Sequence, residues 1–350
     1  MPQDTILLPS SAVAIVGADE VLPCDVIQLS SGIFLVEESS QMRPPAALRH
    51  SLWEQAHSSV LIQAWARERS FTAAQQASMS EFRERLLAVG LLSPRWDHLP
   101  TFYRFCQARQ YNVDKALEMF SNHMAFRKKW QLDELEDTRE FGRIQQFVYE
   151  SKFPMKPAIK AAYPSVHHKV DKQGRIIFID RVGKLDMAAL SRAATDEQLL
   201  RLFVWDFEAS MQFRLPASTM ACGRYISQGV VIVDLLGAKI SNFDHAQRTW
   251  LRQVSAISQD NYPEMLGRLF VINAPVTFTI VWKFIRPLLD KRTRDKVSIL
   301  GSSYTSELLE HIDVEDLPTF LGGKDESCDF VSEKGPWATQ MPQNGDRKGQ

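Results

Sequence analysis

Apolar and polar positions divide the chain into a helical first part and a second part in which short strands alternate with helices. Residues 51–70 have helical spacing, and residues 79–92 show the apolar spacing that is typical of an amphipathic helix. From residue 163 onward, apolar runs of strand length alternate with helical stretches. This order predicts an α/β fold in which helices pack on a small, mostly parallel sheet.

Several elements of the second part can be placed from the same pattern. Residues 163–182 read as a hairpin, and residues 195–214 read as a long helix that Pro216 ends. Residues 229–235 are apolar almost throughout, which is typical of a strand buried on both faces of a parallel sheet. A further strand is predicted at residues 268–274.

Residues 276–289 form a helix that is apolar almost all round. It is too short and too charged for a comfortable membrane span. The segment from Lys283 to Lys296 contains six Lys or Arg residues and only two Asp residues, so it is strongly basic. One interpretation is a buried helix followed by a solvated basic turn, and the other is a surface or pocket for anionic headgroups. Asp290 is expected to cap a short helix that carries Thr293 and Lys296 on one face.

Composition narrows the function classes. Hydrophobic residues make up 45% of the chain and the formal net charge is −1, which argues against bulk nucleic-acid binding. The four cysteines are far apart and are expected to be reduced thiols. No catalytic motif is found, so an enzyme is not expected. His167 and His168 are followed by Asp171, but neighbouring strand residues point to opposite faces, so structural roles are favoured over a metal site.

The first 71 residues have no clear role. Residues 1–42 contain no Lys or Arg, so neither a secretory nor a mitochondrial signal is expected. Trp53 and Trp65 lie in a stretch with helical spacing, where packing is favoured over a membrane-interface anchor. We treat residues 1–71 as an extension.

Five motifs in order resemble the C-terminal half of a Sec14-type CRAL-TRIO domain, the lipid-binding fold of fungal phosphatidylinositol transfer proteins. These motifs are YPE at 262–264, INAP at 272–275, PLLD at 287–290, ILGSSY at 299–304 and LPTFLGGK at 317–324. Residues 99–130 resemble the helical segment that precedes this domain in the family. The resemblance implies a helical lobe at 72–135, a lipid-binding domain at 136–325 and a C-terminal tail at 326–350.

The resemblance also implies a phosphatidylinositol headgroup site made of Arg109, Glu264, Thr293 and Lys296. In the family the Glu pairs with the Lys, and that pairing would satisfy a buried charge. Gln110 stands where the family has a Lys, so one positive charge of the pattern is missing. The other cations of this segment, Arg104, Arg127 and Lys128, are interpreted as helix-surface charges.

The positions that bind phosphatidylcholine in the family depart from its pattern. The residues there are His167, Phe178, Phe207, Gly229 and Val231 in place of Tyr, Ser and Thr. Each missing donor to a buried phosphate would cost about 1–3 kcal/mol. We therefore expect weak or absent phosphatidylcholine binding, and a more apolar second ligand such as a sterol.

The family mechanism implies no bond breaking and no cofactor beyond the bound lipid. Acyl chains would lie under the helix at 276–289, which acts as a gate with hinges near Gly267 and Gly323. The predicted cavity and gate residues are Phe203, Phe207, Met211, Phe278, Val281, Trp282 and Ile285.

The resemblance implies a cytoplasmic monomer that meets internal membranes such as Golgi or endosomes transiently and presents phosphatidylinositol to a lipid kinase. Two alternatives stay open: a carrier or sensor of an apolar small molecule, and a trafficking scaffold that docks through residues 1–70.

Overall fold

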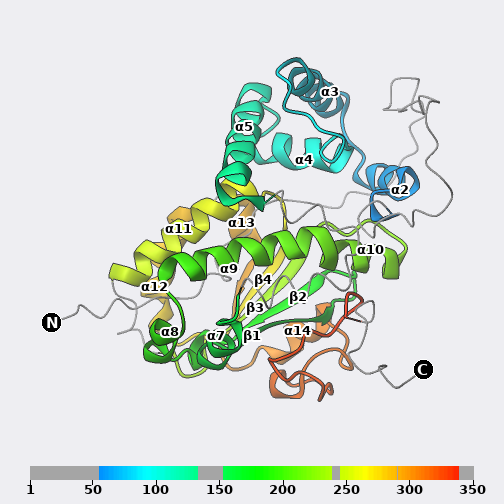
Figure 1. Ribbon diagram of the computed structural model, residues 1–350. Helices are drawn as coiled ribbons and strands as arrows, with labels where there is room; N and C mark the ends of the chain where they lie inside the picture. The colour runs from blue at the N-terminus through cyan, green and yellow to red at the C-terminus, as the bar shows by residue number, and fades with distance from the viewer. Residues whose placement is uncertain (1–54, 133–152, 239–244, 290, 339–350) are drawn as a thin grey trace, which may run out of the picture.

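The computed structural model describes residues 55–132, 153–238, 245–289 and 291–338, and it has a helical lobe beside an α/β lobe (Figure 1). Residues 1–54, with Trp53, and Asp290, the expected helix cap, lie outside the described residues. The helical lobe consists of four helices: α2 Ser59–Arg69, α3 Ala73–Ala88, α4 Leu99–Ala108 and α5 Val113–Trp130. Thr72 and Asn112 cap α3 and α5 by accepting hydrogen bonds from backbone N–H groups.

The core of the helical lobe includes a helix that the sequence analysis assigned to the extension. Trp65 of α2 is buried against Phe71, Tyr103 and Tyr225, with the Arg69 guanidinium over its ring. The packing role predicted for Trp65 is therefore confirmed. α2 packs with the helical lobe although it falls within residues 1–71, and the boundary at residue 71 stays a prediction.

The α/β lobe is built on a sheet of five strands in the order β1 to β5. The strands are β1 Ser165–Val170, β2 Ile176–Asp180, β3 Gly229–Asp234, β4 Leu266–Ile272 and β5 Val297–Ile299. The β1–β2 pair is antiparallel and the other three pairs are parallel. The predicted hairpin and the mostly parallel sheet are thus confirmed, and all six residues of β3 are buried, as its apolar run indicates.

Helices cover the two faces of the sheet differently. One face carries Ile179, Ile232 and Phe270, which pack against α14 Thr305–His311 and the chain that follows it. The other face carries Phe178, Val231 and Leu269. It lies beneath α7 Lys156–Ala162, α8 Met187–Ala193, α9 Asp196–Ala209 and α11 His245–Asn261, the helices around the cavity (Figure 1).

Pro216 does not end the helix that begins at residue 196. α9 continues through a π-helix, Ser210–Arg214, into α10 Leu215–Cys222. The N–H of Leu215 bonds to the carbonyl of Ser210, five residues back, so the helix widens just before the proline. Pro216 then occupies the first turn of α10, where its missing N–H leaves no broken bond.

The predicted apolar helix is shorter than its pattern. α12 covers Phe278–Ile285, and a 3₁₀ turn, Arg286–Leu288, leads to α13 Lys291–Asp295. Further 3₁₀ turns lie at Val182–Lys184 and Thr319–Leu321. The tail residues up to 338 pack on the α/β lobe, where Trp337 is buried in the main core.

Candidate functional site

The four predicted headgroup residues lie around one corner of the molecule, where α4, the loop between α11 and β4, and α13 meet. Arg292 of α13 donates a hydrogen bond of 2.7 Å to the carbonyl of Gln107 on α4. Arg109, which directly follows α4, lies 3.5 Å from Asp260 on α11. We call this region, made of Arg109, Glu264, Arg292, Thr293 and Lys296, the headgroup corner.

Glu264 has a conformation that marks it as more than a loop residue. It is 1% exposed, and its backbone φ of 63° lies in the left-handed region that non-glycine residues rarely adopt. Strain of this kind concentrates at functional sites, where the surrounding structure holds it in place. Arg292, one of the six basic residues counted between Lys283 and Lys296, lies 3.7 Å from the Glu264 carboxylate.

The other headgroup residues are held by local contacts. The Lys296 ammonium donates a 2.7 Å hydrogen bond to the carbonyl of Leu266, the first residue of β4. Thr293 is 1% exposed at the inner side of α13. The Glu264–Lys296 ion pair stays a prediction, while Arg292 is the cation that the described ion pairs place next to this carboxylate.

Buried polar contacts connect the headgroup corner to the cavity wall. Arg127 of α5 is fully buried and donates to both carboxylate oxygens of Glu208 at 3.1 Å. Tyr262 donates to Glu208 at 2.9 Å and stacks on Phe207 with ring centres 4.6 Å apart. Arg104 donates to the carbonyl of Pro263. Arg104 and Arg127 are therefore interior groups, and the prediction that they are surface charges was wrong.

A cavity of about 150 Å³ lies between α7, α8 and α9 on one side and the sheet on the other. All five positions that depart from the phosphatidylcholine pattern line it, namely His167, Phe178, Phe207, Gly229 and Val231. His167, Phe178 and Val231 are partners in the strand register, so they form one row across three strands. This row offers one imidazole and no hydroxyl.

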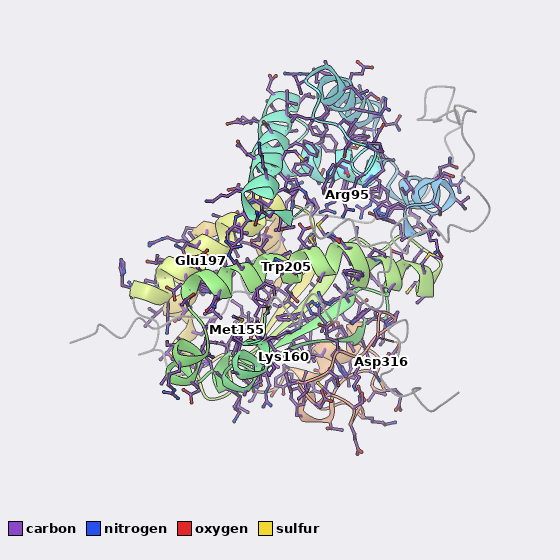
Figure 2. All side chains as sticks on the ribbon, viewed as in Figure 1. Arg95, Met155, Lys160, Glu197, Trp205 and Asp316 are labelled. Atoms are coloured by element: carbon purple, nitrogen blue, oxygen red, sulfur yellow. The ribbon has the colours of Figure 1, made fainter. Side chains whose placement is uncertain are left out.

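Charged side chains gather at one end of the cavity. Arg214 lies 3.0 Å from Asp206 and 2.7 Å from Glu333. Lys156 and Lys160 of α7 line the same end, and Figure 2 labels Lys160 on α7 and Trp205 on α9, the helices that border it. We call this set, with His167, the polar end of the cavity.

The ionisation states at the polar end follow from burial and from Arg214. Burial, followed by the nearby Arg214, lowers the pKa of His167 to about 4, so the imidazole is neutral at pH 7. Burial alone would raise the pKa of Glu333, but the Arg214 guanidinium outweighs it and holds this pKa well below its usual range. Burial lowers the pKa of Lys156 to about 8.

His167, Asp206 and Glu333 offer ligand atoms within 4.8 Å of one another, a grouping that would suit a metal ion. Arg214, however, already pairs with both carboxylates, and two lysines lie nearby. The carboxylates are therefore neutralised by the Arg214 guanidinium, and a metal ion would be repelled by the surrounding positive charge. His168 points away and contacts Asp325, as the alternation of strand residues predicts.

The predicted gate residues do not line the cavity. Two of the predicted cavity residues on α9, Phe203 and Phe207, line the cavity. Met211 lies beside Arg104 near a smaller hollow. Among the described residues, none of the side chains that line the main cavity comes from α12. Phe278 packs on the sheet, and Val281, Trp282 and Ile285 pack near Leu251 of α11. The main cavity therefore lies beneath α7, α8 and α9, and the acyl cavity expected under the helix at 276–289 stays a prediction.

The two predicted hinge glycines have a packing explanation. A Cβ atom at Gly267 would lie 2.9 Å from the Arg175 side chain and 3.1 Å from the carbonyl oxygen of Gly229. A Cβ atom at Gly323 would overlap the carbonyl oxygen of Leu317. Close backbone approach accounts for both glycines, and their hinge role stays a prediction.

The sequence analysis did not identify the site residues whose contacts are with residues far away in the chain. Arg292 belongs to the basic cluster that was recognised, so its position carried a signal. Asp206, Arg214 and Glu333 are separated by up to 127 residues along the chain, and no local pattern links them.

The CRAL/TRIO domain model matches residues 160–323. The chain is 34% identical over 269 residues to the SEC14 cytosolic factor of Candida glabrata, covering 75% of this chain and 84% of that protein. It is 35% identical over 273 residues to the Sec14 cytosolic factor of Schizosaccharomyces pombe, covering 77% and 90%.

A third relative is the phosphatidylinositol/phosphatidylcholine transfer protein SFH12 of Arabidopsis thaliana, with 31% identity over 309 residues. That match covers 86% of this chain but 55% of the length of the plant protein. The crystal structure of Sfh5 aligns with a TM-score of 0.48 and 14% identity, covering 78% of this chain and 92% of that one. Within the described residues, no helix combines the length and apolar character that crossing a bilayer requires.

Proposed function

Since the chain belongs to the Sec14-like CRAL/TRIO family, we propose that it binds phosphatidylinositol in the α/β lobe and exchanges it between membranes. The observation that carries this proposal is the headgroup corner. Glu264, Arg292 and Lys296 bring two cations and a hydroxyl-bearing helix to one place, and Met265, next to Glu264, lines the cavity. A lipid phosphate at the corner would leave its acyl chains directed into apolar surroundings.

Each predicted headgroup residue has a role in this arrangement. Lys296 and Arg109 supply positive charge to the phosphate, and Thr293 supplies a hydroxyl. Glu264 keeps the cations in place when no lipid is bound, because a buried charge without a partner is strongly destabilising.

We also propose that phosphatidylcholine binds weakly. The row made by His167, Phe178 and Val231 lacks the hydroxyl donors that a buried choline phosphate needs, and Gly229 adds none. Lys156 and Lys160 at the same end repel a choline cation.

Membrane contact is proposed to use α12 and the residues around it. Val276 is 91% exposed and Ile280 is 61% exposed, which is unusual for apolar side chains. Lys283 and Arg286 are exposed on the same segment and suit an anionic membrane surface. Because the cavity of about 150 Å³ is smaller than the roughly 300–1,000 Å³ typical of ligand pockets, a two-chain lipid requires the gate to move.

The small cavity also favours a second candidate function, the carriage of one apolar small molecule without phosphatidylinositol transfer. The test that separates the two is transfer of labelled phosphatidylinositol and phosphatidylcholine between vesicles. Wild type should move phosphatidylinositol, Lys296→Ala should lose most of that activity, and Lys115→Ala, at an exposed lysine of α5, should retain it. Transfer that is absent in wild type, or equal in Lys296→Ala, would reject the headgroup assignment.

A further inference from the structure

The polar end of the cavity holds more positive than negative charge. Among the described residues, its cations are Lys156, Lys160 and Arg214, and its carboxylates are Asp206 and Glu333. Arg214 binds both carboxylates, so it accounts for much of their charge. His167 adds an uncharged imidazole. The balance is one positive charge in excess.

The next charged groups outward do not remove this excess. Lys160 donates to the carbonyl of Val331, which belongs to the tail segment that also carries Glu333. Asp329 is the next acid along that segment, and Lys334 lies 3.9 Å from it. These two outer charges balance each other, so the tally of three cations and two carboxylates among the described residues is unchanged.

The rest of the cavity is apolar and narrow. Away from the polar end its walls are formed by aliphatic and aromatic side chains, including Leu199, Leu202, Phe203 and Phe207. A long alkyl chain suits such walls. Because the volume of about 150 Å³ lies below the roughly 300–1,000 Å³ typical of ligand pockets, one chain would require less widening of the cavity than two chains. The cavity therefore combines a cationic end with a slender apolar body.

We propose that this cavity binds a long-chain fatty acid, with its carboxylate at Lys156 and Lys160 and its alkyl chain along Phe203 and Phe207. The inference rests on the proposed role of the cavity as a lipid carrier and names the second ligand. It replaces the neutral, sterol-like ligand expected from the sequence, because the missing hydroxyl donors are accompanied by two lysines that motif comparison did not include.

The charge of the polar end favours a fatty acid over ligands with a cationic or a neutral headgroup. A carboxylate carries one negative charge and matches the excess, whereas a choline headgroup would bring a further cation. Ser210, whose hydroxyl oxygen accepts a hydrogen bond from Arg214, also lines this end and can donate its own proton to a carboxylate oxygen. A neutral alcohol of the same chain length would gain the apolar contacts but not the ion pairs.

The experiment is displacement of a fluorescent fatty acid from the full-length protein by ligands that share one chain. Oleate, oleyl alcohol, oleyltrimethylammonium and cholesterol are compared on wild type, Lys156→Gln/Lys160→Gln and the control Lys115→Gln. Wild type should bind oleate at least about tenfold more tightly than oleyl alcohol, since charge-assisted hydrogen bonds discriminate on this scale. The double variant should lose that preference, while its unchanged affinity for oleyl alcohol shows that it is folded.

Equal binding of oleate and oleyl alcohol by wild type would overturn the inference. So would a preference for cholesterol or for the cationic ligand, or an oleate preference that survives in the double variant. Failure of the proposed function looks different, because vesicle transfer of phosphatidylinositol by wild type is measured without oleate. Transfer without an oleate preference rejects the inference alone, and an oleate preference without transfer rejects the phosphatidylinositol assignment alone.

Discussion

The headgroup corner and the polar end of the cavity are both charged sites beside the same apolar space, yet they are assembled in different ways. The corner draws Glu264, Arg292, Thr293 and Lys296 from 33 consecutive residues of the chain, with Arg109 added from the helical lobe. The polar end draws its groups from α7, β1, α9, the π-helix and the tail. The first site follows the pattern of its family, and the second departs from it.

Under the proposed function, this difference would let one cavity change its second ligand and retain phosphatidylinositol. Residues at the corner depend on each other through short-range contacts, such as Arg292 with Gln107 and Lys296 with Leu266. At the polar end the row of His167, Phe178 and Val231 is held by strand pairing, which tolerates exchange of side chains. Replacement of hydroxyl groups there leaves the corner intact.

The largest expected effect concerns the wall that joins the two sites. Arg127→Met should reduce the free energy of unfolding by about 3–5 kcal/mol, because it leaves Glu208 buried without its guanidinium. Chemical denaturation measures this change. Arg85→Met is the matched control, since Arg85 pairs with an exposed Asp114 and its loss should leave the free energy of unfolding nearly unchanged. Equal losses in the two variants would show that the wall is not a buried electrostatic link.

A second prediction isolates one hydroxyl at the headgroup corner. Thr293→Val keeps the shape of the side chain and should slow phosphatidylinositol transfer about tenfold, as expected for one lost hydrogen bond to a charged phosphate. The control is Thr249→Val on α11, because the hydroxyl of Thr249 donates to the carbonyl of His245 in the same helix. If both variants transfer phosphatidylinositol like wild type, Thr293 does not bind the headgroup.

These predictions depend on parts of the structure that the sequence made accessible to different degrees. The strands, their mostly parallel order and the lipid-binding family followed from apolar runs and from five ordered motifs. The continuation of the helix past Pro216 did not follow, because it depends on a π-helix whose hydrogen bonds reach five residues back. The expectation that a proline ends a helix assumes regular α-helical hydrogen bonds, which the π-helix before Pro216 does not have.

Candidate site residues divide in the same way. Thr293 and Lys296 were placed by a motif, and the structure brings them to the corner with Glu264. Arg104 and Arg127 were taken for surface charges because helix patterns do not reveal contacts with a second lobe. The polar end was not foreseen, since its ion pairs exist only after the tail has packed on α9 and β1.

A third prediction attempts to remove the difference between this chain and its family pattern. Phe178→Tyr/Val231→Thr adds two hydroxyl groups to the row at the polar end and should raise phosphatidylcholine transfer several-fold. Gly229 is left unchanged, because a side chain there would crowd Ile176 at 3.1 Å. Vesicle transfer with labelled phosphatidylcholine measures the gain. An unchanged rate would mean that the lysines, and not the lost hydroxyls, exclude choline.

The smallest expected effect is a dependence of oleate binding on pH. Burial lowers the pKa of Lys156 to about 8, so its ammonium is charged at pH 7 and largely neutral at pH 9.5. A bound carboxylate stabilises the charged form, so oleate affinity should fall a few-fold as pH rises through and above 8. Lys160, Arg214, Asp206, Glu333 and His167 face the same end, and His167 is already neutral in this range. Lys156→Gln should flatten the profile in fluorescence titrations, and a wild-type profile that is already flat would contradict the assignment.

The most direct test of the account is a crystal structure of the protein with phosphatidylinositol bound. The account predicts that the lipid phosphate lies at the headgroup corner, within hydrogen-bond distance of Thr293 and Lys296, with the acyl chains directed toward Phe203 and Phe207. A phosphate found instead at the polar end, beside Lys156 and Lys160, would contradict it.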